Sequence, residues 1–306
     1  MWAPFLCNVF PFRLTFILMY IILVKLIYIK PIKILGDVRN MKKFGLIFLA
    51  LLLTVALGAC SSKEEKVSSA KSKNLYEQIK AKGEITIGTE GTYAPFTYHD
   101  DSQKLTGFDI EIAEEVFKRL DIKPVFVETK WDGMIAGLDA KRYDMVANEV
   151  AVRPDRLEKY DMSEPYIVSK AVLVVHENNN DIKTLDDLKG KKVGQSLDSN
   201  YRKIAEAHGA TNTVVEGFNQ SIDLITSKRI DATINDSLSY LDLKKQRPDL
   251  PIKKVYEEAD ATSNAFLFRK GNKELVDAIN GALADMKKDG TYLAISKKWF
   301  NEDVSK

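Results

Sequence analysis

Cysteine is almost absent from this sequence. The 306 residues contain two cysteines, Cys7 and Cys60. If the chain is cleaved before Cys60, as a pattern described below predicts, no pair remains that could form a disulfide. Small exported proteins often depend on disulfides for stability. We therefore expect the stability of this chain to come from packing.

Motifs for metals and phosphates are also missing. The three histidines, His99, His176 and His208, are scattered without the spacing of a metal site. There is no glycine-rich dinucleotide fingerprint, no phosphate loop and no Gly-x-Ser-x-Gly elbow. We expect no metal, no cofactor, no catalytic residue and a protein that is not an enzyme.

Charge of one sign is not in excess either. Charged residues make up 29% of the chain and the formal net charge is +2, so nothing predicts a nucleic-acid partner. We expect the partner to be a neutral or zwitterionic small molecule.

Long apolar runs are confined to the first sixty residues. Residues 44–57 form an apolar run that follows Lys42 and Lys43 and ends in the sequence LGAC at residues 57–60. A basic flank, a short apolar core and small residues at the end are typical of an export signal. The ending resembles the bacterial lipobox, which implies that Cys60 becomes the lipid-bearing first residue. The alternative is a small-residue helix end with an incidental cysteine.

The N-terminal region divides into three predicted parts. Residues 1–40 contain a second apolar run, at 14–29, which is either one of a tandem pair of membrane segments or part of an extension upstream of the true start at Met41. We favour the extension, with a signal peptide at 41–59. Residues 60–74 are then the lipidated cysteine and a flexible tether, because residues 61–73 have almost no apolar side chains.

From about Leu75 onward, short β-rich runs alternate with helical patterns. This alternation predicts an α/β fold with a mostly parallel sheet. A helix is predicted at residues 110–120, with Asp109 as its N-cap, because apolar residues recur there at helical period. Further helices are expected at residues 200–207, 221–227 and 274–288, followed by a last short one.

One stretch of the chain repeats. The sequence KRYDMVANE at residues 141–149 reappears as KRIDATIND at 228–236, and the same offset pairs Trp131 with Phe218. Chance likeness between two short units is the alternative. If the repeat is real, two lobes of similar build each deliver an Asn-acid pair at the carboxyl end of a strand, where open α/β sheets bind ligands.

The residues around these strand ends suit a zwitterion. Arg156, predicted on the exposed start of a helix, could pair with a carboxylate, although a plain surface arginine is the alternative. The helix start near Ser199 and Asn200 could bind an anion, or could be an ordinary capped end. Asp236 would meet an ammonium group, and Glu149 stands at the equivalent place in the first lobe.

Two acids in one cleft suit a ligand with an amino group at each end, but could instead be a general acid/base couple. Tyr93 and Trp131 would form the apolar walls of the cleft, or could equally belong to the core.

The chain resembles a solute-binding lipoprotein of a polar amino-acid ABC importer over about residues 75–300. The resemblance is carried by the sequences GTEGTYAPF at 88–96, LTGFDIE at 105–111 and DRL at 155–157. It implies a two-lobed, hinged periplasmic-binding-protein fold of type II, each lobe a mixed, mostly parallel sheet flanked by helices. Lobe 1 would comprise residues 75–168 and 262–306, and lobe 2 residues 169–261, with crossings near 166–169 and 261–265.

The family also implies roles for single residues. The ligand carboxylate would meet Arg156 and the helix start near Ser199, and the ammonium would meet Asp236. The sequences WDGM at 131–134, ANE at 147–149 and INDSL at 234–238 are most similar to the cystine-binding branch, which adds Asn148 to the expected site. The chain departs from relatives at Ala151 and Arg153, where a hydroxyl is common, although the backbone N–H of Ala151 could still serve.

The resemblance implies an extracytoplasmic binding component of an ABC importer that captures a polar amino acid, with L-cystine as the favoured ligand. Its partners would be a permease with its ATPase, and the membrane through a lipid on Cys60; we expect a monomer on the outer face of the cell membrane. The alternatives are a dehydratase-like enzyme on the same fold that uses Glu149 and Asp236, and a ligand-sensing module for a separate receptor.

Overall fold

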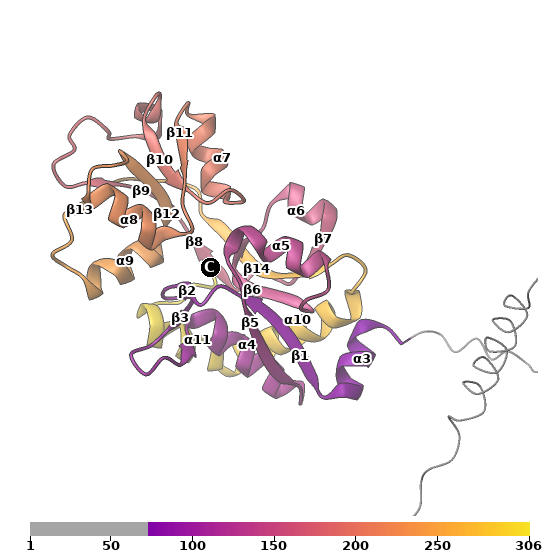
Figure 1. Ribbon diagram of the computed structural model, residues 1–306. Helices are drawn as coiled ribbons and strands as arrows, with labels where there is room; N and C mark the ends of the chain where they lie inside the picture. The colour runs from indigo at the N-terminus through magenta and orange to yellow at the C-terminus, as the bar shows by residue number, and fades with distance from the viewer. Residues whose placement is uncertain (1–72) are drawn as a thin grey trace, which may run out of the picture. The chain divides into compact units, whose positions relative to one another are not determined.

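The structure, a computed structural model, describes residues 73–306 (Figure 1). The predicted extension, the signal peptide at 41–59, Cys60 and nearly all of the tether lie outside the described residues. The first element is helix α3, which begins at Leu75. None of the helices in the described part is long and apolar enough to cross a membrane.

The first lobe is built on a mixed sheet with the strand order β5-β1-β6-β14-β7, and β8 pairs with β14. Strands β5, β1 and β6 pair in parallel, whereas β14 runs antiparallel to its neighbours. Its strands are β1 (Glu84–Thr89), β5 (Lys123–Glu128), β6 (Met145–Ala151), β7 (Tyr160–Met162), β8 (Ile167–Ser169) and β14 (Thr262–Arg269).

Helices and a small second sheet complete this lobe. Helices α4, α10 and α11 contact one another in a layer against the sheet (Figure 1). The helices are α3 (Leu75–Lys82), α4 (Phe108–Arg119), α5 (Trp131–Asp139), α6 (Pro154–Lys159), α10 (Lys273–Asp289) and α11 (Thr291–Phe300). The small sheet consists of β2 (Thr92–Tyr93), β3 (Thr97–His99) and β4 (Leu105–Thr106).

The second lobe has the strand order β11-β10-β12-β9-β13, again with parallel pairs on one side and antiparallel pairs on the other. Its strands are β9 (Ala171–His176), β10 (Lys192–Gln195), β11 (Thr211–Val214), β12 (Ala232–Asp236) and β13 (Ile252–Glu257). Its helices are α7 (Asn200–Ala207), α8 (Phe218–Thr226), α9 (Ser237–Gln246) and the 3-10 turn η1 (Leu185–Leu188). This confirms the predicted two-lobed α/β fold with mixed sheets.

The chain crosses between the lobes twice. One crossing leads from β8 to β9, and the other from β13 to β14. The crossings lie side by side, because Ser169 at the end of β8 pairs with Thr262 at the start of β14. A paired two-strand connection of this kind is suited to a hinge.

The predicted cap of α4 is wrong. Gly107 is the N-cap residue and the helix already includes Asp109, whose side chain is fully buried. The predicted apolar stripe is buried as expected, at Ile112, Ala113, Val116 and Phe117. Asp109 does not cap its helix because its carboxylate turns inward and accepts a hydrogen bond from the backbone of β6.

The internal repeat is present in three dimensions. Helix α5 begins at Trp131 and α8 at Phe218, the residues that the sequence offset pairs. Each helix is followed by a lysine in the left-handed conformation, Lys141 at φ 59° and Lys228 at φ 58°. Such a conformation is uncommon for lysine, so two tight turns of the same kind connect equivalent helices and strands.

A close approach of helix to strand also recurs. A Cβ on Gly88 in β1 would lie 2.5 Å from Cε2 of Tyr143, and one on Gly194 in β10 would lie 2.7 Å from Cδ1 of Ile230. Tyr143 and Ile230 are equivalent residues of the repeat. A glycine in β1 and one in β10 therefore allow large side chains at equivalent positions of the repeat to pack on the sheet in each lobe.

We predict that Gly88→Ala destabilises the protein by about 1–3 kcal/mol, because the new methyl group overlaps the buried Tyr143 ring. The matched control is Gly281→Ala in α10, where a Cβ meets nothing within 4 Å. That change should stabilise by about 0.5–1 kcal/mol, because alanine favours a helix interior. Urea unfolding checks both, and equal effects of the two changes would contradict the packing argument.

Candidate functional site

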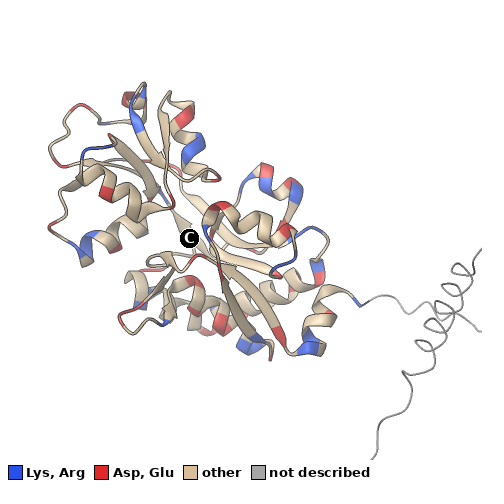
Figure 2. Ribbon diagram, viewed as in Figure 1, with Lys and Arg blue, Asp and Glu red and all other residues tan. Residues whose placement is uncertain are grey.

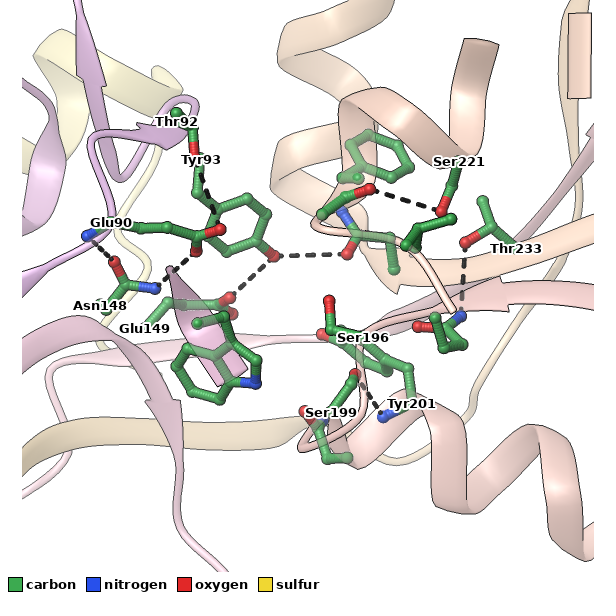
Figure 3. A pocket seen from close by; sticks show the side chains of 17 residues that line it. Glu90, Thr92, Tyr93, Asn148, Glu149, Ser196, Ser199, Tyr201, Ser221 and Thr233 are labelled. Carbon is green, nitrogen blue, oxygen red and sulfur yellow. Dashed lines mark hydrogen bonds between the residues drawn. The ribbon is translucent and has the colours of Figure 1, made fainter. Parts of the chain in front are cut away.

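Side chains from both lobes line one cavity (Figure 3). The first lobe contributes residues that follow β1, begin α5 and lie in β6, and the second contributes residues around β10, α7, α8 and β12. Its lining residues are Glu90, Thr92, Tyr93, Trp131, Asn148, Glu149, Gln195, Ser196, Ser199, Asn200, Tyr201, Val215, Gly217, Phe218, Ser221, Thr233 and Asn235. The cavity thus contains Tyr93, Trp131, Asn148, Glu149, Ser199 and Asn200 of the predicted site, but not Ala151, Arg156 or Asp236.

Asn148 holds an acid that the sequence analysis missed. Its side-chain oxygen accepts the backbone N–H of Glu90 at 2.8 Å, and its Nδ2 donates to Oε2 of Glu90 at 3.2 Å (Figure 3). Burial raises the pKa of Glu90 to about 7. The position of Glu90 immediately after β1 could have pointed to it, because ligands meet parallel sheets at the carboxyl ends of their strands.

Glu149 lies inside strand β6, where the register between β6 and β14 shifts. Its φ is 49°, and its backbone N–H donates to Oδ2 of Asp109 at 2.6 Å. One side-chain oxygen accepts a hydrogen bond from the Tyr93 hydroxyl at 3.0 Å (Figure 3). The other accepts one from Nδ2 of Asn264 at 3.1 Å. Burial raises the pKa of Glu149, and the neighbouring Asp236 raises it further.

Asp236 lies behind the cavity wall. The residue ends β12 as predicted, but its carboxylate is fully buried and caps helix α9, accepting the backbone N–H of Leu238 at 2.8 Å. Its other oxygen accepts the hydroxyl of Ser169. Asn235, the preceding residue, lines the cavity instead and lies 3.5 Å from the hydroxyl of Tyr93.

Arg156 is not exposed, contrary to the sequence prediction. Pro154 occupies the predicted first turn of α6, directly after β6, so Arg156 turns back toward the strand and is 3% exposed. Its Nη1 donates to the carbonyl of Ala151 at 2.9 Å, and its Cζ lies 5.6 Å from the centre of the Trp131 ring. Burial lowers the pKa of Arg156 to about 10. Among the described residues, its Nε and Nη2 find no hydrogen-bond partner.

The second lobe presents the start of α7 to the cavity. Ser199 is the N-cap of that helix and accepts the backbone N–H of Tyr201 at 3.1 Å, as in the capping alternative (Figure 3). Ser196 and Asn200 lie beside it in the cavity lining. The capping hydroxyl can still donate, because it acts here as an acceptor. A capped helix end and an anion site are therefore compatible at this position.

Charged side chains of the two lobes meet outside the cavity. Lys203 of α7 lies 2.8 Å from Asp155 of α6, and Lys130 pairs with Glu216. Along the ribbon of the described chain, basic and acidic positions are interspersed (Figure 2). No group of three or more His, Cys, Asp or Glu in the described part could hold a metal ion.

We predict that Asp109→Asn flattens the pH dependence of stability. Burial raises the pKa of Asp109 to about 7 in the folded protein, from an ordinary value of 3.8. The folded state therefore binds the extra proton, and this residue makes stability fall as pH rises from about 4 to about 7, by at most ~1.4 kcal/mol per pH unit. Urea unfolding at several pH values measures the slope, and an unchanged slope in the variant would rule out this role for Asp109.

Comparisons with known proteins agree with this geometry. Residues 85–302 match the bacterial extracellular solute-binding proteins, family 3. The chain is 49% identical over 269 residues to the L-cystine-binding protein TcyA of Bacillus subtilis strain 168, covering 87% of this chain and 100% of that protein.

Two solved structures are similar as well. The L-cystine solute receptor of Neisseria gonorrhoeae in the unliganded open conformation has 45% identity and a TM-score of 0.54, covering 76% of this chain and 100% of that one. The ancestral amino acid-binding protein AncCDT-1, a precursor of cyclohexadienyl dehydratase, has 31% identity and a TM-score of 0.68, with 74% and 100% covered.

Proposed function

Because this chain belongs to family 3 of the bacterial extracellular solute-binding proteins, we propose that it captures L-cystine in the cavity between its lobes and delivers it to an ABC permease. A solute-binding role for a polar amino acid follows from the family and its relatives. The choice of cystine is supported by the names of similar proteins, and by a cavity wall with two acids.

The proposal is carried by Nε and Nη2 of Arg156, which have no hydrogen-bond partner among residues 73–306. A buried guanidinium whose Nε and Nη2 lack partners is costly unless a ligand completes its hydrogen bonds. A carboxylate fits the planar fork of arginine with two parallel bonds. Arg156 touches the Trp131 ring that lines the cavity, so the α-carboxylate of an amino acid would bind at this side.

The second lobe would complete the carboxylate site. The Ser199 hydroxyl and the first free N–H groups of α7 face the same cavity, and an anion is favoured at the start of a helix. A carboxylate held by Arg156 on one side and by α7 on the other would link the lobes. Ligand binding would then favour the closed arrangement over the open one.

The ammonium groups would meet the acidic wall. Glu90 and Glu149 both line the cavity, whereas Asp236 lies behind it and supplies negative charge at a distance. L-Cystine has two ammonium groups, one at each end, so two acids on the wall match it better than they match an amino acid with one. We assign Glu90 to the second ammonium because Asn148 holds its carboxylate at the cavity.

The protein is extracytoplasmic, like the other members of its family. We further propose that Cys60 carries a lipid, that the following residues tether the protein to the cell membrane, and that it works as a monomer beside the permease. The sequence LGAC at residues 57–60 supports the lipid anchor. Globomycin, which blocks cleavage of lipoprotein signals, should cause an uncleaved precursor to accumulate; a processed, lipid-free protein would contradict the anchor.

A dehydratase-like enzyme is less well supported. Such an enzyme would need Glu149 and Asp236 to exchange protons with the substrate as acid and base. Asp236 is fully buried and does not line the cavity, so only one member of the couple reaches the space where a substrate would lie. We therefore favour binding without turnover.

We expect isothermal titration of the purified protein with L-cystine to show one site per chain, because a single cavity lined from both lobes has two acids in its wall and the guanidinium of Arg156 packed against its Trp131 ring. Arginine, glutamine and histidine serve as comparison ligands and should bind more weakly, since none has two zwitterionic ends. Tighter binding of one of these would change the assigned ligand. Absence of binding by every amino acid tested would reject the proposed function.

Arg156→Ala should weaken amino-acid binding by about 100-fold, because about 3 kcal/mol of charge-assisted hydrogen bonding to the carboxylate is lost. The control is Arg142→Ala, which removes an exposed arginine that lies outside the cavity lining and should leave affinity unchanged. Titration of both variants with the same ligand checks the role. Equal affinities of the wild type and Arg156→Ala would remove Arg156 from the site.

A further inference from the structure

Two carboxyl groups from different lobes meet beside the hinge. Ser169, at the end of hinge strand β8, donates its hydroxyl proton to Asp236 and lies 3.5 Å from Oε1 of Glu149. Asn264, on the other hinge strand, donates to the same oxygen of Glu149 at 3.1 Å. Glu149 also lines the cavity, so this buried pair has one face toward the ligand.

The groups around the pair are acids and phenols. Asp109 of α4 accepts the backbone N–H of Glu149 at 2.6 Å, and it also accepts the hydroxyl of Tyr166 at 3.0 Å. Tyr93 of β2 and Tyr201 of α7 face the pair from the cavity side.

The guanidinium of Arg156 in α6 interacts electrostatically with Glu149, but its contacts are with Ala151 and Trp131. Within the described chain, no lysine, arginine or histidine forms an ion pair with Glu149, Asp236 or Asp109. Two adjacent carboxylates without a cation cannot both ionise easily in a buried space.

The hydrogen bonds also accommodate a proton on Glu149. The single hydroxyl proton of Ser169 is used by Asp236, so Ser169 does not stabilise a negative charge on Glu149 by donating to its Oε1. Tyr93 likewise has one proton, but its oxygen lies near two acceptors, Oε2 of Glu149 at 3.0 Å and Oδ1 of Asn235 at 3.5 Å. A proton on Oε2 of Glu149 would let Glu149 donate to Tyr93, and Tyr93 donate across the lobes to Asn235.

We propose that the Glu149–Asp236 pair holds one proton in the ligand-free protein at neutral pH, and that a ligand ammonium group bound beside Glu149 displaces it. Glu149 is then a positioning residue that directs the Tyr93 hydroxyl toward the second lobe before the ligand arrives. The inference rests on the proposed function, because it takes an ammonium-bearing amino acid as ligand.

The displacement follows from electrostatics. A cation that enters next to a shared proton favours the ionised form of the pair, so the proton leaves to solvent as the ligand binds. The ammonium group of the ligand takes the place of the proton, so the positive charge beside the pair is unchanged. The only bond that breaks is the O–H bond of the protonated carboxyl group. By linkage, affinity should rise with pH, by up to about tenfold per pH unit, wherever the free pair is protonated and the bound pair is not.

The test is isothermal titration of the full protein with L-cystine at pH 7 in phosphate and in Tris buffer, whose different ionisation enthalpies reveal released protons. We expect the wild type to release about one proton more per ligand than Glu149→Gln does, since glutamine keeps the hydrogen bonds but has no proton to lose. Taking the difference between the two proteins removes any titration of the ligand itself. Asp242→Asn is the control, because Asp242 is an acid outside the cavity lining whose pKa is also raised by burial, and it should release as many protons as the wild type.

A second measurement does not depend on the variant folding. The infrared difference spectrum of the wild type on adding L-cystine should lose a protonated carboxyl band. Binding with equal proton release in wild type and Glu149→Gln, or with no loss of that band, would overturn the inference and leave the proposed function intact. Absence of binding of any amino acid by the wild type would overturn both.

Discussion

The hydrogen bond from the backbone N–H of Glu149 to Asp109 is the constraint on which the site depends. It takes the N–H away from the strand ladder and holds Glu149 at φ 49°, a conformation that costs a non-glycine residue about 1 kcal/mol or more. The register between β6 and β14 shifts over the same stretch. Because a bulge interrupts the alternation of side chains, the neighbours Asn148 and Glu149 both face the cavity.

The equivalent acids of the repeat have different places in the two lobes. Glu149 and Asp236 are equivalent residues of two similar units, yet β12 ends at Asp236 and continues into α9, whereas β6 runs on to Ala151. The Asp236 carboxylate therefore caps α9, whereas the Glu149 carboxylate lies at the cavity wall. The two carboxyl groups approach Ser169, where the chain crosses between the lobes, so charge at the cavity wall and geometry at the crossing are linked.

The charged contacts outside the cavity have a smaller role. Lys130–Glu216 and Lys203–Asp155 are well exposed, and such pairs contribute about 0–1 kcal/mol each. The larger electrostatic effects lie inside, where Arg156, Glu149 and Asp236 are removed from water. A ligand that supplied the missing hydrogen-bond partners there would therefore stabilise a closed arrangement of the lobes more than the surface ion pairs do.

The sequence by itself determined the local pattern of this protein. The alternation of helical and β-rich patterns predicted α7 with its observed bounds, and the recurrence of residues 141–149 predicted equivalent turns and strands. The helix and the turns both depend on residues that are neighbours in the chain, and these neighbours can be read from the sequence. It also indicated six of the seventeen residues that line the cavity, because residues at the carboxyl ends of strands gather at one edge whatever the details of packing.

Only the tertiary structure decided which charged groups face the cavity. Arg156 is buried against Trp131, Asp236 is held behind the cavity wall by Ser169, and Glu90 is held in the wall by Asn148. These partners are distant in sequence or are brought near by turns. The bulge at Glu149 depends on Asp109, forty residues earlier. Burial and pKa follow from such long-range neighbours, so no local pattern could state them.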